Sequence, residues 1–266
     1  MLVLAAVSEG LAARLRRAAG KRFAFQPAVN WEEALNAILR HPVEMAVVDP
    51  AMEGQPRARE IERLRVLFPS LPVLLYTHLT PAIAAILLQL GSTGIRQILL
   101  AGHDDHPQRL GEALISEGTQ AVSERLIAAI SDLLADWPGE LRWAIETMVR
   151  DPASVQSVQQ LAERARMDRR TCLRWFARAA LPPPSVILMV FRVVYAHRLL
   201  QDPGYTVEDI AARLGYAQTR SFAQNVKEVF GMTPGELRVR LSPDEALGII
   251  RERYFGHVDR NLVEAS

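Results

Sequence analysis

Two stretches of the chain place long hydrogen-bonding side chains at matching positions. Arg170 and Arg174 are four residues apart, and so are Arg220 and Gln224. Residues four apart lie on the same face of a helix. A guanidinium group can form two hydrogen bonds at once with guanine, and a carboxamide can do so with adenine. The spacing therefore predicts two helices whose exposed faces contact the edges of bases.

Apolar side chains occupy the opposite face of each predicted helix. Cys172 with Phe176, and Phe222 with Val226, are again four apart and lie two positions from the polar pairs. Two positions correspond to about 200° around a helix, so we expect these four side chains to point inward. Exposed helices also carry Arg and Gln for solubility alone, but the repetition of the pattern favours base contacts. The neighbouring side chains suited to phosphate groups are Arg169, Thr171, Gln218, Ser221 and Lys227.

The same two stretches share one layout of helix, short turn and helix. Residues 158–180 turn near Asp168, which suits the N-cap of the second helix, and residues 207–230 turn at Gly215, which suits a left-handed conformation. A helix that follows a tight turn in this way can project into the major groove of DNA. Residues 185–201 form a connecting helix about 25 Å long, of the order of the ~34 Å between successive major grooves.

Several motifs in this region closely resemble the AraC/XylS-type DNA-binding domain. They are residues 192–200 (Arg-Val-Val-Tyr-Ala-His-Arg-Leu-Leu), residues 207–215, Ser221-Phe222, residues 230–234 (Phe-Gly-Met-Thr-Pro) and Arg238, with Lys227 between them. The resemblance covers residues 141–241 and implies an all-α domain with two helix-turn-helix units. It also implies a transcription regulator that is not an enzyme, with double-stranded DNA and RNA polymerase as partners and no cofactor.

The sequence departs from this family at four positions. Gln224 stands where the family often has Arg, Val226 where it has Phe, Cys172 where it has a larger aliphatic residue, and Leu181 where it has Gly. These differences bear on base preference and on helix packing rather than on the fold. We expect Cys172 to be a small core residue and not a redox sensor.

The first 118 residues alternate short apolar runs with amphipathic stretches. The predicted strands are residues 2–7, 23–25, 43–48, 72–76 and 95–100, and the predicted helices are residues 11–19, 31–39, 58–68, 81–90 and 108–117. Apolar strands alternating with helices are typical of a parallel sheet covered on both faces. We therefore predict a doubly wound (βα)5 domain over residues 1–118, a linker helix within 119–140, the all-α domain over 141–241 and a tail over 242–266.

The N-terminal pattern resembles a response-regulator receiver domain. Asp49 ends the third predicted strand, where that family keeps its phosphate acceptor, and Thr77 ends the fourth. The first strand runs into Ser8-Glu9 instead of an acidic pair, and Ala101 stands where a Lys is expected. Phosphoryl transfer to a carboxylate needs positive charge from a metal and that Lys. We therefore favour a degenerate receiver used for dimerisation or for sensing a signal or partner, with Asp49 as phosphoacceptor the alternative.

Two apolar segments are candidates for a homodimer contact. Residues 82–88 are apolar on every face, so the helix is either deeply buried or packs against a second subunit. A second stripe could equally pack within the chain and consists of Leu126, Ile127, Ile130, Leu133 and Leu134.

Composition narrows the remaining classes. The 266 residues include one cysteine, which excludes an intrachain disulfide and fits a reducing, cytoplasmic compartment, and no apolar run approaches the ~18 residues that span a bilayer. Residues 151–241 carry 13 basic and 8 acidic side chains, whereas residues 1–150 carry 15 and 17. The positive balance of the former segment fits a polyanionic partner.

Other residues suggest no catalytic site. His103-Asp104-Asp105-His106 could suggest a metal, but we expect Asp105 to cap the helix that begins at Pro107, and we expect Trp143 and Met148 to lie in the core. An enzyme would need a nucleophile and a base close together, and the sequence shows no such pair. An adaptor with a disabled DNA-binding domain is the third alternative.

Overall fold

The computed structural model describes residues 1–91 and 95–255, except for the side chains of Ala129 and Leu133. The Leu133 position of the predicted apolar stripe therefore lies outside the described residues. The chain divides into two compact units, which we call unit 1 (Met1–Arg125 with Asp202–Gly204) and unit 2 (Leu126–Gln201 with Tyr205–Ser266). None of the described helices combines the length and the apolar character needed to cross a membrane.

Unit 1 is built around a parallel five-stranded sheet. Its strands are β1 (Leu2–Ala6), β2 (Ala24–Pro27), β3 (Val43–Val48), β4 (Val73–His78) and β5 (Gln97–Ala101). They lie in the order β2-β1-β3-β4-β5, and all four pairings are parallel. This is the 2-1-3-4-5 order of flavodoxin-like doubly wound folds. The predicted α/β class of this part of the chain is confirmed.

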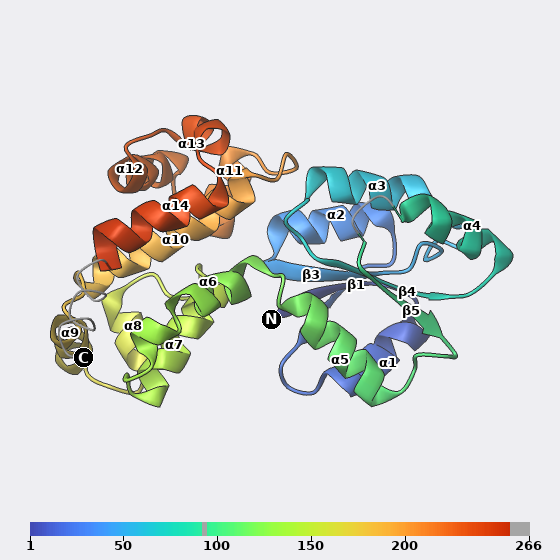
Figure 1. The fold of residues 1–266 in the computed structure, drawn as a ribbon, viewed down its shortest axis with the longest axis horizontal. Helices are drawn as coiled ribbons and strands as arrows, with labels where there is room; N and C mark the ends of the chain where they lie inside the picture. Colours follow the sequence, from blue (N-terminus) through green and yellow to red (C-terminus); the bar gives the residue numbers. More distant parts are fainter. Residues whose placement is uncertain (92–94, 256–266) are drawn as a thin grey trace. The chain divides into compact units, whose positions relative to one another are not determined.

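Helices cover both faces of this sheet (Figure 1). They are α1 (Glu9–Ala19), α2 (Trp31–Arg40), α3 (Ala58–Leu67), α4 (Pro81–Leu90) and α5 (Pro107–Gly118). Helices α1 and α5 pack against one face, and α2, α3 and α4 lie over the other. Strand β3 is buried along its whole length, as expected for a strand between two helical layers.

Unit 2 is helical throughout its described part. Its elements are α6 (Val122–Ile130, which begins in unit 1), η1 (Asp132–Leu134), α7 (Gly139–Arg150), α8 (Val158–Arg164), α9 (Arg169–Arg178), α10 (Pro184–Leu200), α11 (Val207–Arg213), α12 (Thr219–Phe230), α13 (Pro234–Arg240), α14 (Pro243–Ile250) and the π-helical turn η2 (Arg251–Phe255). Helix α10 contacts α7, α8, α11, α12, α13 and α14. All ten residues from Phe191 to Leu200 are buried, so α10 is the central element of the unit.

Two helices lie in segments where the sequence was not assigned to helix. Thr233 is the N-cap of α13 and Ser242 is the N-cap of α14, and each forms a complete capping box, with Glu236 and Glu245 respectively. Helix α14 packs along α10, within residues 242–266 (Figure 1). The described part of this segment is therefore helical.

Two predictions about individual residues were wrong. Trp143 is 53% exposed, whereas the buried stripe of α7 consists of Leu141, Ala144, Ile145, Met148 and Val149. Trp143 lies two positions from Leu141 and Ile145, which places it on the opposite face. The expectation of a buried Met148 is confirmed.

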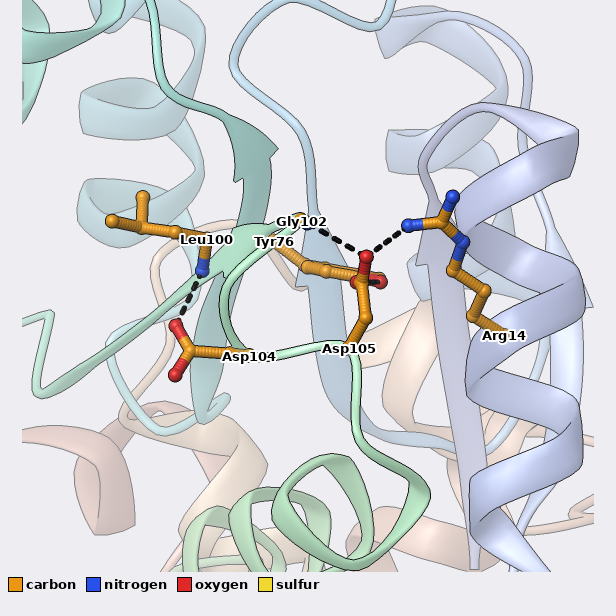
Figure 2. Close-up of polar contacts among 6 residues, drawn as sticks. All are labelled: Arg14, Tyr76, Leu100, Gly102, Asp104 and Asp105. Atoms are coloured by element: carbon orange, nitrogen blue, oxygen red, sulfur yellow. Dashed lines mark hydrogen bonds and ion pairs between the residues drawn. The ribbon is translucent and has the colours of Figure 1, made fainter.

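Asp105 does not cap α5, because the N-cap residue is His106 and no side chain bonds there. The Asp105 carboxylate instead accepts hydrogen bonds from the Tyr76 hydroxyl and the Gly102 N–H and pairs with Arg14 (Figure 2). Asp104 accepts from the Leu100 N–H at 2.8 Å. Within residues 1–91 and 95–255, no cluster of three or more His, Cys, Asp or Glu side chains could hold a metal ion.

Helix α4 is not deeply buried, which was one of the two alternatives for its apolar sequence. Only Ile83 and Leu90 are buried, while Ala82, Ala85 and Leu88 are exposed, Leu88 by 85%. The outer side of α4 is therefore an apolar surface of unit 1.

Candidate nucleic-acid interface

Helices α8 and α9 form the first helix-turn-helix unit. The turn between them has two hydrogen bonds, from the Met167 N–H to the Ala162 carbonyl and from the Arg166 N–H to the Glu163 carbonyl. This pair of bonds is the Schellman arrangement, which requires a left-handed residue, and Arg166 has φ 51°. Asp168 then caps α9 as predicted, accepting from the Thr171 N–H at 2.8 Å. Hydrogen bonds from the Thr171 hydroxyl and the Thr171 N–H lower the pKa of the Asp168 carboxyl.

Helices α11 and α12 repeat this geometry. The Tyr216 N–H bonds the Ala211 carbonyl, and the Gly215 N–H bonds the Ala212 carbonyl. Gly215 has φ 77°, so the predicted left-handed turn is confirmed. A capping box between Thr206 and Asp209 begins α11, and the left-handed Gly231 ends α12. The two units therefore have the same backbone design, although the second turn is one residue longer.

The inward faces of α9 and α12 agree with the prediction. Cys172, Phe222 and Val226 are 0% exposed, and Phe176 is 1% exposed. Burial raises the pKa of the Cys172 thiol to about 11. The thiol is therefore protonated at neutral pH and packs as a small apolar side chain.

The outward faces carry the predicted polar side chains. Arg170 and Arg174 are exposed on α9, and Arg220 and Gln224 are exposed on α12. The predicted phosphate contacts that are also exposed are Arg169, Gln218, Ser221 and Lys227.

Thr171 is the one member of the predicted set that is half-buried. Its hydroxyl donates to Asp168 at 2.7 Å, so its proton is used inside the cap of α9. It accepts a weak contact from Arg174 at 3.5 Å, which steadies the first turn of that helix.

Polar residues between the two helix-turn-helix units were not predicted as functional. Arg192 on α10 is 8% exposed and donates to the carbonyls of Pro152 and Val155. Tyr216, in the turn before α12, accepts from the Asn225 side chain at 2.9 Å. The sequence predicted no separate role for Arg192, which was part of a longer motif. The available signal was a single arginine within the otherwise apolar residues 186–194.

The predicted phosphoacceptor lies in unit 1, at the end of β3. Asp49 is 6% exposed, and its Oδ1 accepts from the Thr77 hydroxyl at 2.7 Å and from the Ala51 N–H at 2.9 Å. Glu9 is exposed and pairs with Arg16 at 2.8 Å. The structure brings the predicted Asp and Thr together, and it places Glu9 in an ion pair along α1.

Comparison with known proteins identifies the helical part. Residues 161–240 match the helix-turn-helix domain family. A Streptomyces lividans protein described as an AraC-like transcription regulator is 32% identical over 95 residues, which cover 36% of this chain and 31% of that protein. Residues 161–240 are an AraC-type helix-turn-helix domain.

A second relative matches an alignment of similar length. The RCS-specific HTH-type transcriptional activator RclR of Escherichia coli strain K12 is 31% identical over 97 residues, 36% of this chain and 34% of RclR. The alignments therefore span about a third of each curated relative. In this chain the AraC-type domain contains α9 and α12, the second helices of the two helix-turn-helix units, with α10 between them.

Two solved structures resemble the chain more distantly. The xylose-binding transcription activator XylR has 14% identity and a TM-score of 0.34, over 89% of this chain and 69% of that one. NtrX from Brucella abortus, solved with ADP, has 13% identity and a TM-score of 0.37, over 93% and 79%. These scores are too low to extend the AraC-type assignment beyond its own residues.

Proposed function

We propose that this protein is a sequence-specific DNA-binding transcription regulator. Helices α9 and α12 insert into successive major grooves of one duplex, and residues 141–241 form the DNA-binding part. The observation that carries the proposal is the paired exposure of Arg170 with Arg174 and of Arg220 with Gln224, each on a helix that follows a tight turn closed by two backbone hydrogen bonds. The names of both curated relatives support the same role.

The charge and capping of the domain fit this role. Eight of the nine predicted DNA-contacting side chains are exposed, and they include four arginines and Lys227. In this proposal Arg170, Arg174, Arg220 and Gln224 contact bases, and the flanking polar residues contact phosphates. Thr171 acts mainly through its hydrogen bond to Asp168, which holds the first turn of α9.

The first experiment is selection of binding sites from a random duplex pool by the full-length protein. Arg170→Ala or Arg220→Ala is expected to lose about 1–3 kcal/mol of binding free energy on the selected site and to relax base choice at one position. Lys227→Ala is expected to weaken all sequences alike and to flatten the dependence of affinity on salt. Arg142→Ala, an exposed arginine on α7, is the matched control and is expected to bind as the wild type does.

Two results would contradict the proposal. A wild-type protein that enriches no motif would exclude sequence-specific binding and would favour an adaptor role. A uniform loss from Arg170→Ala across all sequences would show that α9 does not present this residue to bases.

We propose that unit 1, which contains the predicted 1–118 domain, provides dimerisation or senses a signal or a partner. The exposed apolar side of α4 favours assembly, because such a surface is more often covered than left in water. A homodimer would place two DNA-binding domains on one operator, and contact with RNA polymerase would follow at a promoter.

Phosphorylation of Asp49 is the alternative input, and the hydrogen bond between Asp49 and Thr77 favours it. Incubation with a small phosphodonor and Mg²⁺, followed by intact-mass measurement, tests it, with Asp49→Asn as the control. We favour assembly or sensing without phosphorylation, since Ala101 supplies no positive charge and Glu9 is paired with Arg16.

A further inference from the structure

A charged side chain lies in the interior of the DNA-binding domain without a carboxylate among its hydrogen-bond partners. The Arg192 guanidinium donates through Nε to the Pro152 carbonyl at 3.3 Å and through Nη2 to the Val155 carbonyl. Both carbonyls belong to the segment that leads into α8. Burial lowers the pKa of Arg192, because neutral carbonyls repay only part of the lost hydration of the cation. A buried guanidinium of this kind adds little to the stability of the fold, but its directional hydrogen bonds fix the positions of the groups that it contacts.

The same guanidinium interacts with the second helix-turn-helix unit. The hydroxyl of Tyr216, in the turn between α11 and α12, favours the charged form of Arg192 and so opposes the effect of burial on the Arg192 pKa. The Tyr216 hydroxyl also accepts from Asn225, which is on recognition helix α12, at 2.9 Å. Arg192 therefore connects the approach to α8 with the helix that carries Arg220 and Gln224.

The backbones of the two units meet beside this network. A methyl group added at Gly215 would lie 2.0 Å from Nε2 of Gln156 and 3.3 Å from Cα of Ala153. Gln156 Nε2 donates to the Ala153 carbonyl at 2.9 Å and approaches the Leu214 carbonyl at 3.5 Å. The segment before α8 and the turn before α12 are thus in contact, and a side chain at Gly215 would displace the end of the Gln156 side chain.

We propose that this joint, formed by Arg192, Tyr216, Gln156 and Gly215, fixes the separation and angle of the two recognition helices, and that Arg192 is its central positioning residue. The inference rests on the proposed function. A recognition helix must align with its groove before its side chains can pair with bases. A stiff joint therefore restricts binding to one spacing between the two half-sites, whereas a loose joint tolerates several.

The test measures spacing selectivity separately from base selectivity. After the wild-type site has been selected, duplexes are made in which the segments contacted by α9 and α12 are kept while one or two base pairs are inserted or removed between them. Arg192→Met keeps much of the side-chain length but removes every donor. Tyr216→Phe removes only the hydroxyl that meets Arg192 and Asn225. Arg142→Met is the matched control, because it removes an exposed arginine of the same unit.

We expect both joint variants to lose about tenfold of the discrimination between the selected spacing and the altered ones. Base preferences within each half-site should stay as in the wild type, because Arg170, Arg220 and Gln224 remain exposed on folded helices. Arg142→Met should keep the wild-type discrimination. Thermal unfolding of each variant shows whether its domain is folded, and Tyr216→Phe provides the test if Arg192→Met does not fold.

Two outcomes would overturn the inference. Folded joint variants could keep the wild-type spacing selectivity, or they could lose affinity equally for every spacing, as a structural role alone predicts. A wild-type protein that selects no site would instead contradict the proposed function, so the two failures are distinguishable.

Discussion

Two non-glycine residues of unit 2 have the left-handed backbone conformation that favours glycine. Arg166 has φ 51° in the first helix-turn-helix turn, and Ala180 has φ 53° after α9. The Ala180 N–H bonds the Ala177 carbonyl and the Leu181 N–H bonds the Phe176 carbonyl, so α9 also ends in a Schellman arrangement. A left-handed conformation costs an L residue about 1–2 kcal/mol. Both residues are exposed and therefore recover little of that cost through packing.

Replacing Ala180 by glycine is expected to stabilise the protein. The gain should be about 0.5–1 kcal/mol in the free energy of unfolding, since relief of the left-handed strain exceeds the added entropy of the unfolded chain. The measurement is the urea midpoint at unchanged m value. Ala177→Gly, an exposed position within α9, is the control and should lower the midpoint. Equal shifts in both variants would show that the conformation at Ala180 is not strained.

Asp105 is a second residue whose contribution can be isolated. Burial acts to raise the pKa of its carboxyl, but hydrogen bonds from Tyr76 and Gly102 and the charge of Arg14 outweigh burial and leave the pKa below its ordinary 3.8. Burial, followed by the hydrogen bond to Asp105 and the charge of Asp105, raises the pKa of Tyr76 to about 12, although Arg14 opposes the shift. The ionised carboxylate therefore ties β4, the loop after β5 and α1 together (Figure 2).

Asp105→Asn is expected to destabilise unit 1 at neutral pH. A lowered folded-state pKa stabilises the fold above the unfolded-state pKa, and this contribution is lost as the pH falls through the folded-state value. The stability difference between wild type and variant should thus be largest above about pH 5 and should shrink below pH 3.8. Urea unfolding from pH 3 to 7 measures it, and a pH-independent difference would mean that the charge is not involved.

At the scale of elements, the sequence predicted most helices of unit 2 because their apolar faces are periodic. Helices α9 and α12 lie where the helix-turn-helix layout predicted them, after the turn near Asp168 and the turn at Gly215. Helices α13 and α14 were missed because they are short, although Thr233-x-x-Glu236 and Ser242-x-x-Glu245 are capping-box sequences. The recognition faces follow from helical spacing alone, whereas the joint at Arg192 depends on residues 40 positions apart and is invisible to local patterns.

His197 links two of these elements and gives a prediction about pH. It lies on α10, is 1% exposed, and its Nε2 bonds the Leu241 carbonyl at 3.0 Å, just after α13. Burial and the charge of Arg198 lower the pKa of His197 below 6.5, although the bond to Leu241 opposes the shift. Protons therefore bind the unfolded chain more readily than the folded one, and stability falls as the pH drops below about 6.5.

His197→Gln is expected to flatten this dependence, since glutamine can still donate to Leu241 but does not titrate. Thermal midpoints of wild type and variant should converge between pH 7 and pH 5. The two proteins are compared by the change of thermal midpoint with pH and not by the midpoint itself, because the substitution also changes packing against Phe230. Parallel slopes would show that His197 does not titrate on unfolding.

At the scale of the whole molecule, charge and exposed apolar surface are segregated along the chain. The net excess of basic residues falls within residues 151–241, which include the AraC-type domain. Helix α4 of unit 1 has no charged residue, and its exposed residues are Pro81, Ala82, Ala85, Leu88 and Gln89. If the basic segment binds DNA and the apolar side of α4 mediates self-association, a substitution can change one of these activities without changing the other.

Leu88→Glu is accordingly expected to abolish self-association and to leave folding intact. Leu88 is 85% exposed, so the substitution removes little packing within the chain, but it would place a charge in an apolar contact between subunits. Sedimentation velocity should show a wild-type dimer and a Leu88→Glu monomer with the same thermal midpoint. Val66→Glu, at a 68% exposed position of α3, is the control and should remain dimeric.

The monomeric variant should keep the base preference of the wild type but bind a two-fold operator more weakly, because each half must then be bound independently. A wild-type monomer, or a Leu88→Glu dimer, would mean that α4 is not the contact between subunits.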